Sequence, residues 1–198
     1  LETSLKEALQ KQALKYDKGG DAHYDTISAF IKSVRGSDPD AAVYYMARML
    51  ESGEDPLFIA RRLVILASED IGNAAPQGLT LANAGFQAVH AVGMPEARII
   101  LSQVTTWLAS APKSNAAYMA VDQATEDARN FPAEPIPLHI RNAPTKLMKS
   151  MDYGRGYKYA HDHEGGFVEQ DYLPEKLRNR IYYHPRAIGM EQAGKERR

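Results

Sequence analysis

Residues 38–72 read DPDAAVYYMARMLESGEDPLFIARRLVILASEDIG, and this stretch carries the start and stop signals that decide the fold. The pairs Asp38-Pro39 and Asp55-Pro56 each place a capping carboxylate before a proline that suits the first turn of a helix. Gly53 and Gly72 are residues of the kind that end helices. The stretch therefore predicts two amphipathic helices joined by a short turn. Their apolar stripes are Ala42, Tyr45, Met46, Met49 and Leu50, then Ile59, Ala60, Leu63, Val64, Ala67 and Ile71.

The same periodicity extends on both sides of this stretch and predicts helices over residues 24–34, 76–92, 95–108 and 114–128. The connections are short, which favours antiparallel neighbours in an α-helical bundle or collar. No strand pair with hairpin turn chemistry occurs before residue 130, so the sequence predicts an all-α fold. The expected inward residues are Ile27, Phe30, Ile31 and Val34; Leu79, Ala82, Phe86 and Val89; Ala97, Ile100, Leu101, Val104, Trp107 and Leu108; and Ala117, Ala120, Val121, Ala124 and Ala128.

The two ends of the chain differ from this central part. Residues 1–15 also have helical spacing, and the glycine-containing segment 17–21 reads as a linker, so we expect a first domain over residues 1–20. A second domain covers residues 21–190, and residues 191–198 form a frayed terminus. After Asn130, four prolines predict an extended segment and residues 145–151 a short helix. From Asp152 on, glycine, tyrosine and histidine predict an irregular tail, with a short strand pair as one option.

Composition and motifs narrow the classes of function. The 198 residues carry a net charge of −1 and no cysteine, which excludes disulfides and cysteine-based zinc sites or nucleophiles. Neither a Gly-x-x-x-x-Gly-Lys-[Ser/Thr] loop nor a Gly-x-Gly-x-x-Gly loop is present. We therefore expect no catalytic residue, cofactor-binding residue or metal site in these residues. No apolar run reaches the length of a membrane span.

Two small groups of polar residues remain as alternatives. His161 and His163 could face one cation in an extended chain, but nothing nearby supplies the further ligands that zinc requires. Glu69 and Asp70 lie near a predicted helix C-terminus, where the helix dipole disfavours negative charge. They are expected to meet a basic partner, for which Arg61 and Arg62 are the nearest candidates.

A segment rich in basic and aromatic residues, 139–161, is the main candidate for a binding surface. Its cations could hold phosphates while its rings stack on bases, a combination that suits single-stranded nucleic acid. The alternative is that the tyrosines pack the tail onto the bundle while the lysines face water. The candidate contact residues are Arg141, Lys146, Lys149, Tyr153, Arg155, Tyr157, Lys158 and Tyr159.

Several of these segments together resemble a known family. Residues 33–45, 53–63, 67–72, 92–97, 111–116, 137–148 and 153–161 match, in order, the C-terminal region of the replication-associated recombination protein A family. That family includes the bacterial MgsA/RarA proteins and the Werner-helicase-interacting proteins. The resemblance covers residues 21–189, and residues 1–16 look like the end of a AAA+ lid domain.

The resemblance implies more than the residues alone indicate. Members are clamp-loader-like AAA+ ATPases whose ATPase activity depends on DNA, and they are linked to stalled replication forks and recombination. Their C-terminal helical collar holds the protein as a tetramer. ATP and Mg²⁺ would belong to an upstream core, so this segment is expected to be no enzyme by itself. The implied partners are further copies of the chain, single-stranded or forked DNA and single-strand-binding protein, in the bacterial cytoplasm at the nucleoid and without a membrane. For the interface between copies, the alanine-rich helices between Pro76 and Asn130 are our candidate; a nucleic-acid or partner-binding module using residues 139–161 is the alternative.

Overall fold

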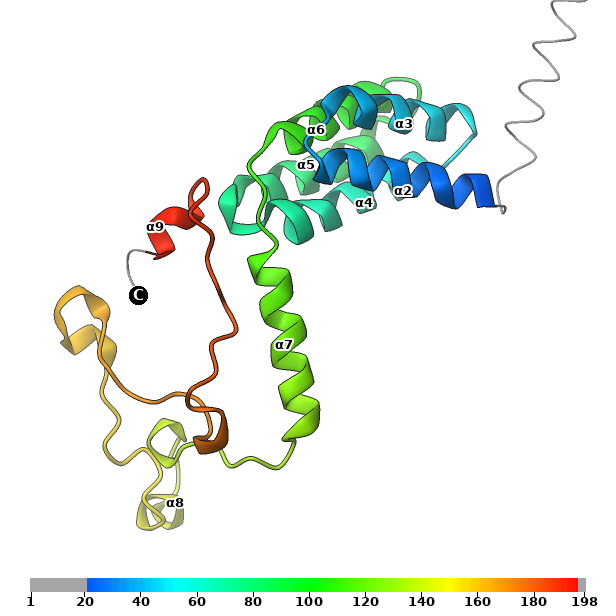
Figure 1. Cartoon of the computed structure of the whole chain (residues 1–198). Helices are drawn as coiled ribbons and strands as arrows, with labels where there is room; N and C mark the ends of the chain where they lie inside the picture. The colour runs from blue at the N-terminus through cyan, green and yellow to red at the C-terminus, as the bar shows by residue number, and fades with distance from the viewer. Residues whose placement is uncertain (1–20, 196–198) are drawn as a thin grey trace, which may run out of the picture. The chain divides into compact units, whose positions relative to one another are not determined.

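A computed structural model describes residues 21–195, which form helices and loops without a strand (Figure 1). The all-α prediction is confirmed. The predicted helix over residues 1–15 and residues 17–20 of the predicted linker lie outside the described residues, and Asp21, the last linker residue, begins α2. The α-helices are α2 (Asp21–Arg35), α3 (Pro39–Glu51), α4 (Pro56–Leu66), α5 (Gln77–Val92), α6 (Ala97–Ser110), α7 (Ala116–Asn130), α8 (Lys146–Ser150) and α9 (Glu191–Lys195). A π-helix, η1 (Ala67–Ile71), and the 3₁₀ turns η2 (Gly72–Ala74), η3 (Leu138–Ile140), η4 (Ala160–Asp162), η5 (Glu164–Gly166) and η6 (Glu175–Leu177) complete the elements.

The chain divides into two compact units, which we describe separately. The bundle unit runs to Ala120 and resumes at Tyr183, so its described part is residues 21–120 and 183–195. The insert unit is the intervening stretch Val121–Tyr182. Helix α7 begins in the first unit and ends in the second.

The helix starts of the bundle unit follow the predicted caps. Asp38 Oδ1 accepts a hydrogen bond from the Ala41 backbone N–H at 2.9 Å, and Asp55 Oδ1 accepts one from the Leu57 N–H at 3.0 Å. Both carboxylates thereby satisfy an N–H that the first turn of a helix leaves without a partner. The aspartate-proline pairs therefore set the beginnings of α3 and α4, as the sequence predicted.

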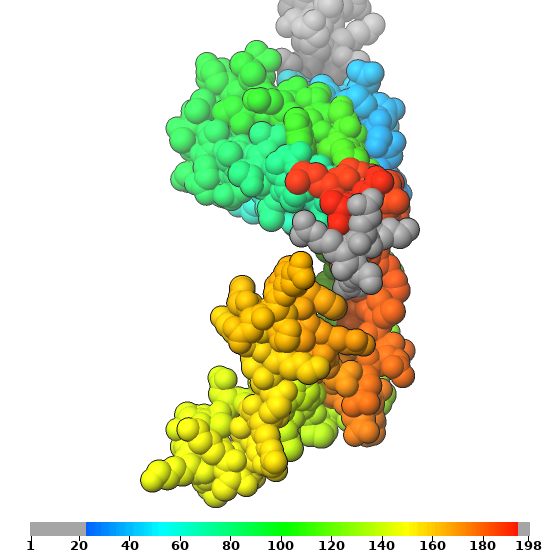
Figure 2. All heavy atoms as spheres, turned by 90° about the vertical axis from the view of Figure 1, so that its left-hand side faces the viewer, coloured from blue at the N-terminus to red at the C-terminus, as the bar shows by residue number. Residues whose placement is uncertain are grey.

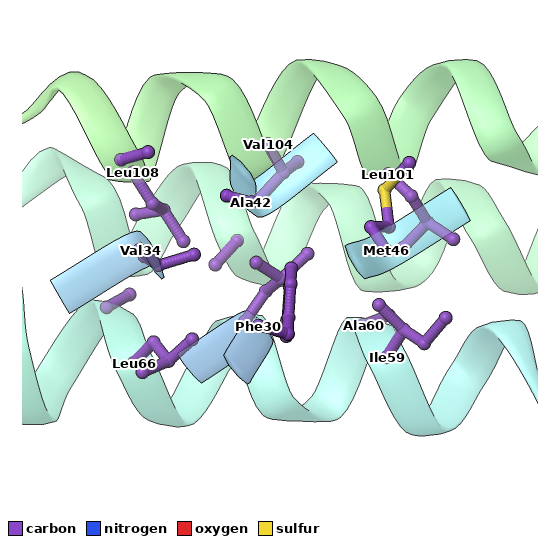
Figure 3. Packing of buried hydrophobic residues seen from close by; sticks show 14 of the residues in the cluster. Phe30, Val34, Ala42, Met46, Ile59, Ala60, Leu66, Leu101, Val104 and Leu108 are labelled. Carbon is purple, nitrogen blue, oxygen red and sulfur yellow. The ribbon is translucent and has the colours of Figure 1, made fainter. Parts of the chain in front are cut away.

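Helices α2 to α6 enclose one hydrophobic core, and α6 lies at its centre. Helix α6 packs against α2, α3, α4 and α5. In Figure 3, Phe30 of α2 points between Ile59 of α4 and Val104 of α6 in the middle of this core. Phe30 is fully buried, and burying a side chain of that size stabilises a fold by about 2–3 kcal/mol. Packing in this core therefore fixes the positions of α2 to α6 relative to one another.

Two glycines of α5 allow it to approach α6 closely. A Cβ at Gly85 would lie 2.6 Å from Val104 Cγ2, and one at Gly78 would lie 3.1 Å from the Trp107 ring. Glycine costs about 1 kcal/mol relative to alanine inside a helix. Here the lost propensity is offset by close packing of two helices.

Three of the local expectations are wrong in the structure. Leu79, expected to face inward, is 45% exposed, because Gly78 and Ala82 hold the buried face of α5 instead. On α7, Ala117, Val121 and Ala128 are exposed although their spacing predicted a buried stripe. The helix expected to continue to Ile71 changes at Ala67 into the π-helix η1. Apolar spacing reports that a helix has an apolar face, but not whether a partner covers that face.

The insert unit is built mainly from loops and short turns (Figure 1). The expected irregular tail is present, but the optional strand pair is wrong, since residues 152–182 form no ladder. Gly154, Gly156, Gly165 and Gly166 of this stretch have positive φ values, which lie outside the β region. Among the described side chains of this unit, only Asp127 and Leu177 are buried. Polar contacts therefore carry much of its order.

The chain returns to the bundle unit after Tyr182, and Figure 2 shows these last residues, in red, lying against the bundle. The Met190 N–H donates to the Ala74 carbonyl at 2.9 Å, and the Tyr183 hydroxyl donates to Glu191 Oε1 at 2.7 Å. Fraying was expected from residue 191 onward, yet Glu191–Lys195 form α9 and Glu191 is buried. Residues 196–198 lie outside the described part.

Candidate functional site

The predicted basic and aromatic segment falls within the insert unit, but the structure divides its residues between two roles. Arg141 Nε donates to the Ile136 carbonyl at 2.7 Å, and Arg141 Nη1 donates to the Tyr153 hydroxyl at 3.1 Å. The guanidinium also lies 5.1 Å from the centre of the Tyr153 ring. Such a stacked, hydrogen-bonded arginine holds a loop together. Arg141 and Tyr153 therefore form a structural contact.

Two further candidate residues, Arg155 and Lys158, line a polar cavity of about 500 Å³ that holds charges of both signs. Arg155 forms an ion pair with Asp152 at 2.9 Å, and Lys158 Nζ donates to the Glu169 carbonyl at 3.1 Å. Glu169 and Asp171 also line the cavity. The carboxylates of Asp152, Glu169 and Asp171 offset part of the positive charge that the sequence suggested for the segment.

Among the candidate residues, two lysines and two tyrosines are exposed and take no part in the contacts described above. Lys146 and Lys149 are exposed on α8, and Tyr157 and Tyr159 are about half exposed. Phe167, which the sequence analysis did not single out, is 73% exposed. Any nucleic-acid contact of this unit would use these side chains first.

The metal alternative at His161 and His163 gains no support from the structure. The His161 ring packs at 5.1 Å from the Tyr159 ring, and both histidines are exposed. Between residues 21 and 195, no group of three metal-binding side chains comes together.

Glu69 and Asp70 do meet a basic partner, but the expected one is wrong. Arg35 Nε donates to Asp70 Oδ1 at 2.6 Å, and Arg35 Nη2 donates to Glu69 Oε1 at 2.9 Å. Arg61 instead pairs with Asp55 at 3.2 Å. The π-helix η1 carries both carboxylates to the end of α2, 34 and 35 residues earlier in the chain. Asp70 is only 7% exposed, and the hydrogen bond that it accepts raises the pKa of Arg35.

This ion-pair cluster forms one wall of a cavity of about 540 Å³ in the bundle unit. Lys113, Ser114 and Asn115 line it from the link between α6 and α7, Tyr118 from α7, and Arg186 from the returning C-terminal segment. Lys113 Nζ donates to the carbonyls of Ala109 and Ala111, at 2.8 and 2.5 Å. Burial lowers the pKa of Lys113, although nearby Asp70 acts in the opposite direction. Sequence spacing could not reveal this cavity, because its residues lie far apart in the chain.

The bundle unit also exposes large apolar side chains, mainly within the helices proposed for an interface. Val92 is 54% exposed and Ile99 58% exposed, on α5 and α6. An apolar groove of about 380 Å³ adjoins Trp107, Pro112 and Met190. None of the helices between residues 21 and 195 is long and apolar enough to cross a membrane.

Comparison with known proteins places the chain in a family. Residues 36–198 match the family model described as MgsA AAA+ ATPase C terminal, and residues 2–35 match the AAA C-terminal domain. The chain is 48% identical over 184 residues to replication-associated recombination protein A of Coxiella burnetii, covering 92% of this chain and 42% of that protein. It is 47% identical to the Bacillus subtilis protein of the same name, covering 96% and 44%. It is 49% identical to ATPase WRNIP1 of Dictyostelium discoideum, covering 88% and 20%.

The chain spans less than half the length of these curated relatives. The model that matches residues 36–198 covers most of the sequence, including every helix from α3 onward. The chain belongs to the MgsA AAA+ ATPase C-terminal family.

Proposed function

We propose that this chain assembles copies of a AAA+ ATPase into an oligomer, expected to be a homotetramer, that acts in replication and recombination. The observation that carries this proposal is the set of large apolar side chains left open on α5, α6 and α7. They are Leu79, Val92, Ile99 and Met119. Large apolar side chains that gather on the surface of a soluble domain are typical of a binding face. These residues fall within the alanine-rich region that the sequence indicated.

The mechanism would be geometric. A rigid five-helix bundle can hold the ATPase cores that precede it at a fixed spacing and couple their movements. In this proposal ATP and Mg²⁺ belong to those cores, and the expected partners are DNA and single-strand-binding protein. The Coxiella and Bacillus relatives, whose names contain replication and recombination, support this assignment.

The test is the solution mass of the chain by light scattering over a range of concentrations. The expected result is a mass near four times 22.0 kDa that persists on dilution. Val92→Glu and Ile99→Glu place a charge on the proposed face and should lower the mass. Lys32→Glu is the matched control, since Lys32 is an exposed residue of α2, outside the proposed face. A monomer at every concentration would rule out assembly by these residues.

A second candidate function is single-stranded nucleic-acid binding by the insert unit. The observation in its favour is that Lys146 and Lys149 are exposed and that the rings of Tyr157 and Tyr159 are about half exposed. Stacking of one base on a ring contributes about 1–3 kcal/mol.

Binding of a fluorescent single-stranded oligonucleotide at several salt concentrations tests this candidate. The triple replacement of Lys146, Lys149 and Lys158 by alanine should weaken binding and reduce the slope of log K against log salt by about 2. Lys32→Ala, an exposed lysine of α2 in the bundle unit, is the control. Arg141 is unsuitable for this test, since its removal would disturb the loop. Unchanged affinity in the triple variant would refute the candidate.

A further inference from the structure

The cavity that contains Arg35 has more positive than negative charge. Its lining includes three cations, Arg35, Lys113 and Arg186, and two carboxylates, Glu69 and Asp70. Arg35 donates one hydrogen bond to each carboxylate, and Asp70 Oδ2 is buried without a hydrogen-bond partner. Within the described part of the chain, neither Lys113 nor Arg186 lies at salt-bridge distance from a carboxylate. Two cations from separate segments thus line one cavity without a salt bridge to a carboxylate.

We propose that this cavity is a binding site for a phosphate group, held between Lys113 and Arg186. The proposal is independent of oligomerisation, and its residues differ from those of the basic segment in the insert unit.

Lys113 is the first reason. Its ammonium group has three N–H donors, of which two are used by the Ala109 and Ala111 carbonyls. The third remains for a ligand. A charge that is partly removed from water, with only neutral carbonyls as acceptors, is stabilised when an anion approaches it.

The second reason is that the cavity wall is rigid. The Ser114 N–H donates to the Asp70 carbonyl at 2.8 Å, which fastens the residue after Lys113 to the π-helix. Gly72 has a φ of +50°, and a Cβ there would lie 2.6 Å from the Ser114 carbonyl oxygen. The link between α6 and α7 is therefore held in one position. Ligand binding then costs little conformational entropy, because the loop is already ordered.

Arg186 brings the second cation from the other end of the unit. Its Nη2 donates to Asn115 Oδ1 at 3.0 Å. This bond places the guanidinium beside Asn115, two residues after Lys113 in the chain. Gly189, three residues later, holds this segment against the bundle, since a Cβ there would lie 2.2 Å from the Ala74 carbonyl oxygen. Arg186 therefore lies on a segment that is packed in one position against the bundle.

Phosphate matches this arrangement better than a singly charged anion does. Its several oxygens can accept from the planar guanidinium fork of an arginine and from the point charge of a lysine simultaneously. A cavity of about 540 Å³ exceeds the size of one phosphate, so a phosphate attached to a larger molecule also fits, with the Tyr118 ring at the wall. The shared chemistry is a phosphate group, either free or as part of a nucleotide.

The test is isothermal titration calorimetry of the full chain with sodium phosphate and, separately, with sodium chloride at matched ionic strength and pH. We expect saturable binding of phosphate and no saturable binding of chloride. Arg186→Gln should weaken it about tenfold, the loss of one charge-assisted hydrogen bond. Lys113→Met should act similarly, and because it also removes contacts within the fold, its folding is checked by circular dichroism. Lys149→Gln, an exposed lysine of α8, is the matched control and should leave binding unchanged.

The outcomes are distinct. A phosphate signal that does not exceed the chloride signal, or Arg186→Gln with wild-type affinity, overturns the proposal. Adenosine 5′-monophosphate identifies the source of the phosphate: tighter binding than inorganic phosphate indicates a nucleotide ligand, and equal binding indicates free phosphate.

Discussion

The bundle unit and the insert unit are stabilised by different means. The bundle unit buries Phe30, Ile59, Leu63 and Leu101 in one continuous core. The insert unit buries only Leu177 and the carboxylate-bearing Asp127 among its described side chains, and leaves Phe167 open. Apolar burial is the main stabilising contribution to a fold, and the insert unit has little of it. We expect the bundle to unfold as one cooperative body and the insert unit to open locally at lower cost.

The contacts of Asp127 show what replaces a core in the insert unit. Its Oδ2 accepts from Arg180 Nε at 3.0 Å and from the Tyr182 hydroxyl at 2.9 Å. These bonds join the second half of α7 to the stretch that leads back to the bundle. The Asp127 carboxylate therefore links the start of the insert unit to its end.

The largest expected effect is on the core. Phe30→Ala should lower the free energy of unfolding by about 3–5 kcal/mol, since it leaves a cavity among α2, α4 and α6. Phe167→Ala, the same change at an exposed position of the insert unit, should alter it by less than about 0.5 kcal/mol. Urea denaturation followed by circular dichroism measures both. Equal losses would contradict the exposed position of Phe167.

The next effect concerns the buried carboxylate of the bundle unit. Arg35→Met should cost about 2 kcal/mol, because Asp70 stays buried without its partner while the half-exposed arginine was partly screened by water. Arg61→Met removes the exposed pair with Asp55 and should cost under about 0.5 kcal/mol. The same denaturation experiment compares the two. A larger loss in Arg61→Met would contradict the pairing described above.

A smaller and local effect is expected at Asp127. Asp127→Asn weakens the bonds to Arg180 and Tyr182, and should lower the free energy of local opening by about 1 kcal/mol. Hydrogen exchange should show faster exchange over residues 176–182, with unchanged protection in α6. Faster exchange in both regions alike would indicate that the insert unit has no separate opening.

The smallest effect appears only at high pH. Burial, and then the hydrogen bond that it donates to Asp127, raise the pKa of Tyr182 above its ordinary value of 10.0. The folded chain thus holds this proton more tightly than the unfolded chain. The stabilisation is complete below the ordinary value and is lost as the pH rises through the raised one.

Hydrogen exchange over residues 176–182 measures this loss. Protection should decrease above about pH 10 in the wild type, and Tyr182→Phe should lack this component. Tyrosinate absorbance, compared between the two proteins, gives the pKa itself. A Tyr182 that ionises at or below the ordinary value would contradict the buried hydrogen bond.

The sequence by itself determined the helices and where most of them begin. Capping and proline geometry are local properties, so Asp38-Pro39 and Asp55-Pro56 were sufficient to place α3 and α4. The family was also determined by sequence, since its motifs cover both units. The lining of the core at Phe30, Leu101 and Val104 followed from apolar spacing.

Tertiary structure alone decided which partner each side chain has. Arg35, Asp70, Lys113 and Arg186 come together only because α2, the π-helix, the α6–α7 link and the C-terminal segment meet at one place. Leu79 and Val121 have helical spacing but no cover, while Arg141 is taken by Tyr153 and thus lost to any ligand. Spacing along a chain encodes the face of one element. The contacts between distant elements depend on how the whole core packs, and no local pattern records them.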